Sequence, residues 1–376
     1  MRLLFVASLH HPSVPGPGSG EEAAEPLSFP SSQGYHFWVN SLTKMGHTCD
    51  VFWRSTSRWP WARPRSQHMT EKPSVARVLH ALAASLPWID PDVLWRNRRL
   101  LQHARAFRPD VLVLIGGNEV ILVETLAAIK RELRSFVVYT CGTSPIVFSH
   151  SIERRAARLY DLVVSNDKYH AIQWLELGAP RAEVLPLAGV DPDFHRHHDS
   201  VDSETALDSC DVGFVGTLVP SRLYSGRIAA LEALAEFDLA IWSVHEVPDS
   251  LRPAHRGPAL GERMVQAMSA SKIVVNPHGD FMRYGGNMRL FETCGAGVLQ
   301  IVDDVPAVHE WFRVGTDLVT YRDPEDLRRK VAYYLSHEME RRQISASGQR
   351  HVYAHHTYDQ RMARLIDLIH AAEMTR

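Results

Sequence analysis

Cysteine is scarce in this sequence, and none of it is arranged in pairs. The 376 residues include 4 cysteines, which are Cys49, Cys141, Cys210 and Cys294. Because no Cys-x-x-Cys pair occurs, zinc fingers, thioredoxin-type redox chemistry and a disulfide framework all lose support. We therefore expect four free thiols and a cytoplasmic protein, since thiols stay reduced in that compartment.

Long apolar runs and an excess of charge of either sign are also missing. The apolar run at residues 3–7 is shorter than the roughly 7–15 residues of a secretory signal. Runs such as 111–115 have the length of strands, so we predict no transmembrane helix, while peripheral membrane contact stays open. With 41 Lys+Arg against 43 Asp+Glu, the formal net charge is -2. This balance argues against a general nucleic-acid binder, which needs a basic surface.

Motifs for several other chemistries are missing or out of context. The sequence contains neither a GxSxG elbow nor a P-loop. Residues 18–23 match the GxGxxA dinucleotide pattern, but they do not directly follow a strand and Pro26 interrupts any helix after them. The histidines within 195–198 and 355–356 lack the spacing of metal ligands, and we interpret them as solvated or packing residues. The Asp-x-Asp at 191–193 is interpreted as a turn, so no metal site is predicted.

What the sequence does contain is a repeated alternation of short apolar runs and amphipathic segments. The first half has predicted strands at 3–8, 49–53, 111–115, 136–140, 162–165 and 184–187, and helices at 34–45, 121–133, 152–159 and 169–177. The second half has predicted strands at 212–215, 239–242, 273–275, 298–302 and 318–321. Its predicted helices lie at 227–235, 263–268, 288–294 and 357–369, and a further helix is predicted to begin at 323. This alternation is typical of parallel sheets that are covered on both faces. We predict an N-terminal α/β domain at 1–190, a linker at 191–209, a second α/β domain at 210–356 and a C-terminal helix at 357–376.

The strongest functional signal is the run Arg-Tyr-Gly-Gly-Asn-Met-Arg-Leu-Phe-Glu at residues 283–292. A glycine-rich turn before a helix, here with Gly286 and Asn287, exposes backbone N–H groups that favour a phosphate. Arg289 adds a permanent positive charge for the same anion. Glu292 follows one helical turn later and can accept hydrogen bonds from ribose hydroxyls. The run therefore predicts binding of a nucleoside diphosphate, and a surface loop with an exposed Arg–Glu pair is the alternative.

Weaker candidates lie after other predicted strands. Gly216, Thr217 and Arg222 follow the strand at 212–215 and form a second candidate phosphate edge. His278 lies in the loop after the strand at 273–275, which faces the same end of the predicted sheet. In the first half, His36 and Glu119 are candidate catalytic bases, with Asn118 and His150 beside them as weaker candidates. For each of these residues a structural role is the alternative.

These residues together suggest a family. The second half resembles the C-terminal domain of GT-B glycosyltransferases, especially the spore-maturation-protein-like group related to glycosyltransferase family 4. The resemblance is carried by Asn-Met-Arg-Leu-Phe-Glu at 287–292, Cys-Gly-Ala-Gly at 294–297 and residues 319–327, with weaker likeness at 356–361 and 187–191. It extends over about residues 183–370.

The resemblance implies two Rossmann-like domains whose parallel sheets face a central cleft, with a nucleotide-sugar donor held mainly by the second domain. Arg289 would then bind the phosphates and Glu292 the ribose, with Gly216, Arg222 and Asn287 as further donor contacts. It implies a UDP or GDP sugar and neither an obligatory metal nor another cofactor. The final helix would cross back onto the first domain.

The sequence departs from the family at one position. Family 4 enzymes carry a glutamate eight positions before the ribose glutamate, where this chain has Tyr284. The sugar contact is then absent or taken over, with His278 and Asp280 as candidates.

The predicted activity is metal-independent transfer of a sugar, of the hexosyltransferase type, to a peptide, a natural product or a surface glycan. His36 or Glu119 would act as the base if the reaction inverts, and residues 10–32 would gate the acceptor. The alternatives are a nucleotide-sugar epimerase or hydrolase of the same fold, and a non-catalytic nucleotide-sugar-binding protein.

Overall fold

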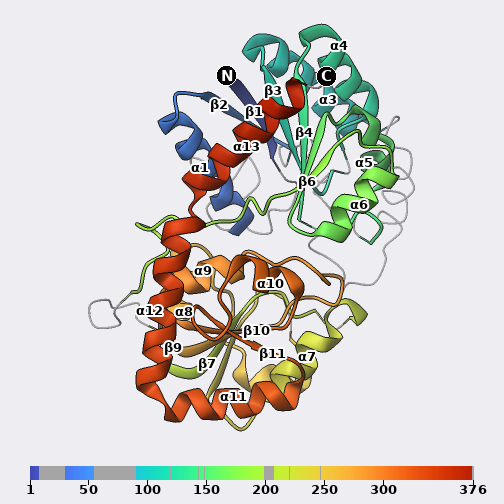
Figure 1. The fold of residues 1–376 in the computed structure, drawn as a ribbon. Coiled ribbons are helices and arrows are strands. Elements are labelled where there is room, and N and C mark those ends of the chain that lie inside the picture. Colours follow the sequence, from blue (N-terminus) through green and yellow to red (C-terminus); the bar gives the residue numbers. More distant parts are fainter. Residues whose placement is uncertain are drawn as a thin grey trace, which may run out of the picture. The chain divides into compact units, whose positions relative to one another are not determined.

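The computed structural model describes residues 1–7, 30–54, 90–118, 120–142, 144–147, 149–198, 207–219, 221–245 and 247–374. It divides into two compact units, one made of Met1–Leu185 with Met362–Arg376 and the other of Pro186–Arg361 (Figure 1). The last helix, α13 (Tyr358–Glu373), therefore begins in the second unit and continues in the first. Residues 191–198, which we predicted as linker, belong to the second unit.

The first unit is built around a parallel sheet of six strands in the order β2-β1-β3-β4-β5-β6. The strands are β1 (Arg2–Ala7), β2 (Thr48–Trp53), β3 (Val111–Ile115), β4 (Phe136–Cys141), β5 (Leu162–Ser165) and β6 (Ala182–Val184). The helices that accompany them are α1 (Pro30–Lys44), α3 (Pro91–Phe107), α4 (Val123–Leu133), α5 (Ser151–Arg155) and α6 (Lys168–Glu176), with a short 3₁₀ turn at Ala157–Leu159. Continuous apolar strands between helices are the expected pattern for a parallel sheet that is buried on both faces.

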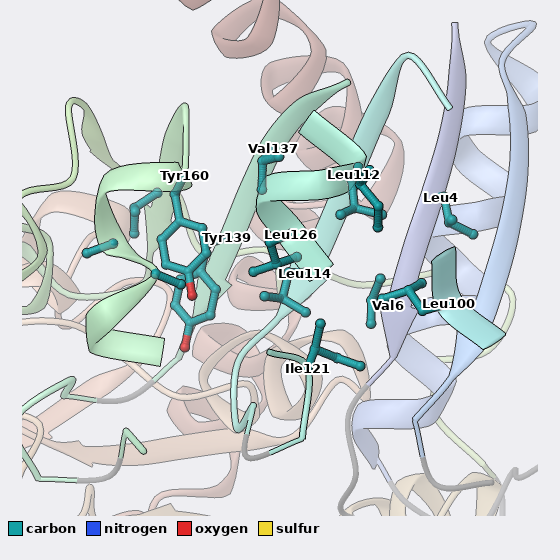
Figure 2. Packing of buried hydrophobic residues seen from close by; sticks show 14 of the residues in the cluster. Leu4, Val6, Leu100, Leu112, Leu114, Ile121, Leu126, Val137, Tyr139 and Tyr160 are labelled. Atoms are coloured by element: carbon teal, nitrogen blue, oxygen red, sulfur yellow. The ribbon is translucent and has the colours of Figure 1, made fainter. Parts of the chain in front are cut away.

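The core of the first unit joins the central strands to α3 and α4. Figure 2 shows the leucine and valine side chains of β1, β3 and β4 packed with Leu100 of α3 and Leu126 of α4. The rings of Tyr139 and Tyr160 stack beside them, with centroids 4.5 Å apart (Figure 2).

The second unit holds a parallel sheet of five strands in the order β11-β10-β9-β7-β8. The strands are β7 (Cys210–Val215), β8 (Leu239–Trp242), β9 (Ser271–Asn276), β10 (Leu299–Asp303) and β11 (Val319–Tyr321). The helices are α7 (Ser225–Glu232), α8 (Glu262–Ser269), α9 (Arg289–Gly295), α10 (Pro306–Trp311), α11 (Pro324–Ser336) and α12 (Glu338–His355), with 3₁₀ turns at Arg222–Tyr224 and Asp249–Ala254.

Both faces of this second sheet are covered, because successive strand residues enter different clusters. Ile273 and Val275 of β9 pack in one apolar cluster with residues of α7 and α11. Val274, which lies between them, packs in another cluster with residues of α8. Side chains along a strand alternate between the two faces, so helices lie on both sides of the sheet.

Several predicted elements are confirmed and others need correction. The strands at 111–115, 162–165 and 239–242 have the predicted bounds, and Asp323 caps α11 by accepting the N–H of Asp326 at 2.8 Å. The strand predicted at 184–187 is wrong, since β6 lies at Ala182–Val184. The loop predicted at 10–32 ends earlier, because α1 begins at Pro30, and its first twenty residues fall outside the described part of the chain.

Two long helices, α3 and α12, were not predicted from the sequence. The inward positions of α12 include Arg341, Ser345 and Gly348 beside Ile344 and Val352, so its apolar periodicity is weak. The prediction of free thiols is confirmed for all four cysteines. Among the described helices, none has the length and apolarity needed to cross a membrane.

Candidate functional site

The candidate donor site lies at the carboxyl edge of the second sheet. Strands β7, β9 and β10 are neighbours and run parallel, so their last residues, Val215, Asn276 and Asp303, lie along one edge. Ligands in such sheets bind at this edge. Helix α9 begins here at Arg289, and the glycine-rich turn precedes it.

Arg289 and Glu292 form an ion pair on the first turn of α9. The Nη1 atom of Arg289 donates to Oε2 of Glu292, and its Nε donates to the backbone oxygen of Val215 at 3.2 Å. The side chain of Arg289 is 16% exposed and that of Glu292 is 3% exposed. The alternative of an exposed Arg–Glu pair is therefore wrong. Because the pair is largely removed from water, its charges are screened less than a surface pair would be.

His278 links the end of β10 to the glycine-rich turn. Its Nδ1 lies 2.7 Å from Oδ1 of Asp303, while its Nε2 accepts the backbone N–H of Asn287 at 3.1 Å. A neutral ring that accepts at Nε2 carries its proton on Nδ1, where it donates to the carboxylate. Burial acts to raise the pKa of Asp303, but the contact with His278 outweighs it and holds that pKa below its usual value. His278 therefore positions the turn, with both ring nitrogens bonded to protein groups.

Asn287 is held in place by its side-chain amide. Its Nδ2 donates to Oδ1 of Asn276 at 2.8 Å, and Nδ2 of Asn276 donates back to Oδ1 of Asn287 at 3.0 Å. The same Oδ1 accepts the N–H of Leu290 at 3.3 Å and so caps the start of α9. The backbone N–H of Asn287, which we expected to face a phosphate, is already bonded to His278. The asparagine therefore orients α9 and its arginine.

Gly286 is required by packing at this turn. A Cβ atom on it would lie 2.7 Å from Cδ2 of Leu290 and 3.0 Å from the ring of Trp311. Real Cβ contacts are longer, so a side chain here would make the side chains of Leu290 and Trp311, or the turn itself, shift. The glycine serves close packing, which the sequence pattern alone did not distinguish from a phosphate cradle.

The loop that follows β7 is joined to the loop that follows β9 by Arg227, a residue that sequence reasoning missed. Its Nε donates to the oxygen of Pro277 at 2.8 Å and its Nη1 to the oxygen of Thr217 at 2.7 Å. The guanidinium also lies over the ring of Tyr224, 4.9 Å from the centroid. Burial lowers the pKa of Arg227. An arginine on an amphipathic helix gives no sequence signal for this role.

The other predicted residues of this loop differ in burial. Gly216 continues the sheet, because its N–H donates to the oxygen of Trp242 at 3.0 Å. Thr217 is partly buried and Arg222 is exposed. Together with the residues at 278–292, these residues all belong to the second unit.

Asp280 and Tyr284 are occupied by partners within the second unit. Oδ2 of Asp280 accepts the hydroxyl of Ser225 at 2.5 Å, and Oδ1 accepts the N–H of Gly226 at 3.2 Å, which closes the start of α7. The hydroxyl of Tyr284 donates to the carboxylate of Glu310 on α10. Asp280 and His278, the two candidates for a sugar contact, are thus already hydrogen-bonded to other groups of the protein.

His195 is a second residue whose place the sequence did not reveal. We interpreted the histidines of 195–198 as solvated or packing residues, and His195 is buried at 1% exposure. Its Nε2 lies 4.0 Å from Oε1 of Glu292. Since Glu292 is a predicted site residue, His195 lies beside the candidate donor site.

The first-half candidates are not gathered around one group. His36 is exposed on α1, where its Nε2 lies 3.1 Å from Nδ2 of Asn40. Glu119 lies outside the described residues. Asn118 is fully buried and binds the oxygen of Ile121 and the carboxylate of Glu153 through its own N–H groups. His150 caps α5, so Asn118 and His150 both have structural roles.

Possible metal ligands are not clustered in the part of the chain that the structure describes. No group of three or more histidine, cysteine, aspartate or glutamate side chains there could hold a metal ion.

Known proteins resemble part of this chain in sequence and almost all of it in fold. Residues 227–367 match the family model described as glycosyl transferase-like. Spore protein CgeB of Bacillus subtilis (strain 168) is 22% identical over 286 residues, which cover 70% of this chain and 84% of that protein.

Two solved structures share the fold over almost the entire chain. Anabaena Alr3699/HepE in complex with UDP-glucose is 14% identical with a TM-score of 0.61, and the match covers 98% of this chain and 99% of that one. Sucrose-phosphate synthase from Thermosynechococcus elongatus is 11% identical with a TM-score of 0.64, and the match covers 100% of both chains. The predicted α/β GT-B fold and the resemblance to GT-B glycosyltransferases are confirmed.

Proposed function

We propose that the chain is a glycosyltransferase that transfers a sugar from a nucleoside diphosphate sugar to an acceptor hydroxyl, amine or thiol. The match of residues 227–367 to the glycosyl transferase-like family model and the GT-B fold support this proposal. The observation that carries the proposal is the buried pair of Arg289 and Glu292 at the carboxyl edge of the second sheet. A fixed cation beside a fixed carboxylate suits a diphosphate and a ribose on the same ligand.

Arg289 has the donors that this role requires. A guanidinium carries five N–H groups, and the bonds to Val215 and Glu292 use two of them. The remaining donors can bind phosphate oxygens. When the bond between the sugar C1 and the phosphate oxygen breaks, negative charge grows on the diphosphate. A cation that is already fixed in place stabilises this charge without having to reorganise.

Glu292 is proposed to accept hydrogen bonds from the ribose hydroxyls. A carboxylate with one oxygen on Arg289 keeps lone pairs on its other oxygen for a hydroxyl donor. The proposed further donor contacts are Gly216, Thr217 and Arg222, while His278, Gly286 and Asn287 shape the turn that carries Arg289. The base is proposed to be uracil, since the Anabaena protein of the same fold was solved with UDP and with UDP-glucose.

The reaction is proposed to proceed without an obligatory metal. Arg289 would supply the positive charge that faces the negatively charged diphosphate. If the product inverts configuration, a base must remove the acceptor proton, and His36 and Glu119 remain the proposed candidates. A peptide, a natural product or a surface glycan is proposed as acceptor, and a hexose as the sugar.

The test is a metal-free thermal-shift screen with UDP, GDP, ADP, TDP and CMP and their sugar conjugates. A ligand at 100 times its Kd stabilises the folded state by about 2.7 kcal/mol, which is readily seen. We expect UDP and one UDP-sugar to raise the melting temperature, and Glu292→Gln to reduce that shift. Arg252→Ala is the matched control, since Arg252 forms an exposed pair with Asp249.

The outcomes separate the alternatives. Sugar transfer to an added acceptor supports the proposal. Release of UDP or isomerisation of the sugar nucleotide without acceptor favours the epimerase or hydrolase of the same fold. Binding with no turnover favours the non-catalytic protein. No shift with any nucleotide contradicts the donor site.

A further inference from the structure

His195 is fixed in a single ring orientation by the turn that carries it. The backbone N–H of Asp191 donates to Nδ1 of His195 at 3.0 Å. The backbone oxygen of Asp191 is farther from Nδ1, at 3.3 Å, and accepts the backbone N–H of His195 at 2.7 Å. We therefore assign Nδ1 as the acceptor of the Asp191 N–H. A neutral ring that accepts at Nδ1 carries its proton on Nε2.

The surrounding backbone is also packed tightly. The hydroxyl of Tyr353 donates to the backbone oxygen of His195 at 2.8 Å. A Cβ atom on Gly295 of α9 would lie 3.1 Å from Cβ of His195, so the glycine permits the turn and α9 to approach closely. The ring is therefore held against the helix that carries Glu292.

The protonated edge of the ring faces the carboxylate of Glu292. Nε2 lies 4.0 Å from Oε1, while Oε2 is bound to Arg289. This distance is too long for a direct hydrogen bond. The side chains are only 2% and 3% exposed, so an N–H dipole still acts on the charge through a medium of low polarity. Burial lowers the pKa of His195, which keeps the ring neutral near pH 7.

We propose that His195 is a positioning residue for the nucleotide ribose, because its Nε2–H dipole lies beside Oε1 of Glu292 while Arg289 holds Oε2, and so biases the orientation of the carboxylate. This inference rests on the proposed function and deepens it. Arg289 alone holds one oxygen of the carboxylate, which leaves the group free to rotate about its last side-chain bond. The Nε2–H dipole 4.0 Å from the other oxygen favours one rotational orientation of the carboxylate. In that orientation Oε1 would be presented to a ribose hydroxyl.

Two substitutions separate this role from a structural one. The amide nitrogen of glutamine reaches the position of Nε2, so His195→Gln keeps a donor toward Glu292. The amide oxygen of asparagine reaches the position of Nδ1, so His195→Asn keeps the acceptor for the Asp191 N–H but loses that donor. Melting of both variants without nucleotide reports whether the second unit folds.

The readout is the ratio of the Kd values for 2′-deoxy-UDP and UDP, measured by calorimetry on the full chain. We expect the natural protein to prefer UDP about tenfold or more, since a hydroxyl bound to a carboxylate is a charge-assisted bond. His195→Gln should keep that preference, and His195→Asn should lose most of it while binding 2′-deoxy-UDP as before.

The contrary results are equally definite. Retention of the ribose preference in folded His195→Asn overturns the proposal, as does its loss in folded His195→Gln with retention in His195→Asn. Equal binding of UDP and 2′-deoxy-UDP by the natural protein also overturns it, since Glu292 then does not bind that hydroxyl. Failure of the natural protein to bind any nucleoside diphosphate instead contradicts the proposed function itself.

Discussion

The first prediction concerns the ion pair of Arg289 and Glu292. It separates the contribution of the pair to folding stability from its proposed role in nucleotide binding. The carboxylate of Glu292 is 3% exposed and has the guanidinium as its charged partner. Arg289→Met removes that partner and leaves a buried charge. Removing one side of a buried pair costs about 3–5 kcal/mol. The 16% exposure of Arg289 lets water approach the site, which places the expected cost near the lower end.

The double variant Arg289→Met with Glu292→Gln should recover most of this loss. Without the carboxylate there is no buried charge left to compensate, and replacing both partners of such a pair is often close to neutral. The coupling energy of the cycle should therefore favour the double variant by about 2 kcal/mol or more. Neither the single nor the double variant should keep the proposed nucleotide affinity.

The assay is differential scanning calorimetry, because two compact units are not expected to unfold in a single transition. For a unit of this size, 1 kcal/mol corresponds to about 2–4 °C. A loss of about 3 kcal/mol thus lowers the second unit's transition by about 6–12 °C. A shift below about 2 °C in Arg289→Met, or a double variant less stable than both singles, would refute the buried-pair argument.

Three further predictions concern other contacts. The pKa of Asp303 is depressed by His278, so its stabilisation is present above the unfolded value and is lost as the pH falls through the folded one. The difference in melting between the natural protein and Asp303→Asn should be constant near neutral pH and should shrink progressively as the pH falls from about 4 toward the lower folded pKa. A difference that stays constant over that acid range would contradict the pairing. Gly286→Ala should cost about 1–3 kcal/mol in chemical denaturation from overlap with α9 and α10, whereas the control Gly142→Ala, whose nearest neighbour would be 3.9 Å away, should cost far less. Arg54 is fully buried and donates to backbone oxygens at the ends of β1 and β3. Arg54→Met should therefore lower the stability of the first unit by about 1–3 kcal/mol or more, and an unchanged transition would show that these bonds are replaceable.

The core of the candidate donor site could be anticipated from the sequence because its signal is local. The predicted arginine and glutamate are three residues apart and lie on one turn of a helix, so their contact follows from helical spacing alone. Asn287 and Gly286 were also identified, although their roles differ from the expected ones. They cap and pack the helix, and the asparagine N–H binds His278.

The partners of these residues could not be anticipated, because they come from distant strands. Val215 is 74 positions from Arg289, and Asp303 is 25 positions from His278. Such pairs meet only through the strand order of the sheet, which places the ends of β7, β9 and β10 side by side. His195 is a stronger case, since most residues of the segment 191–198 are polar or charged and it nevertheless becomes buried against α9.

The contacts around the glycine-rich turn also explain how a chain with tyrosine at position 284 can keep that turn in place. The glycine-rich turn is fixed from one side by His278 and from the other by the packing of Gly286 against α9 and α10. Neither restraint involves the side chain at 284, whose hydroxyl binds Glu310 instead. We therefore expect the proposed binding of the diphosphate and ribose to be independent of position 284, and the sugar to be the part of the donor that a change there affects. It follows that substitution of Tyr284 should alter discrimination among UDP-sugars and leave the affinity for UDP itself nearly unchanged. Equal losses of affinity for UDP and for every UDP-sugar in Tyr284→Phe would contradict this separation.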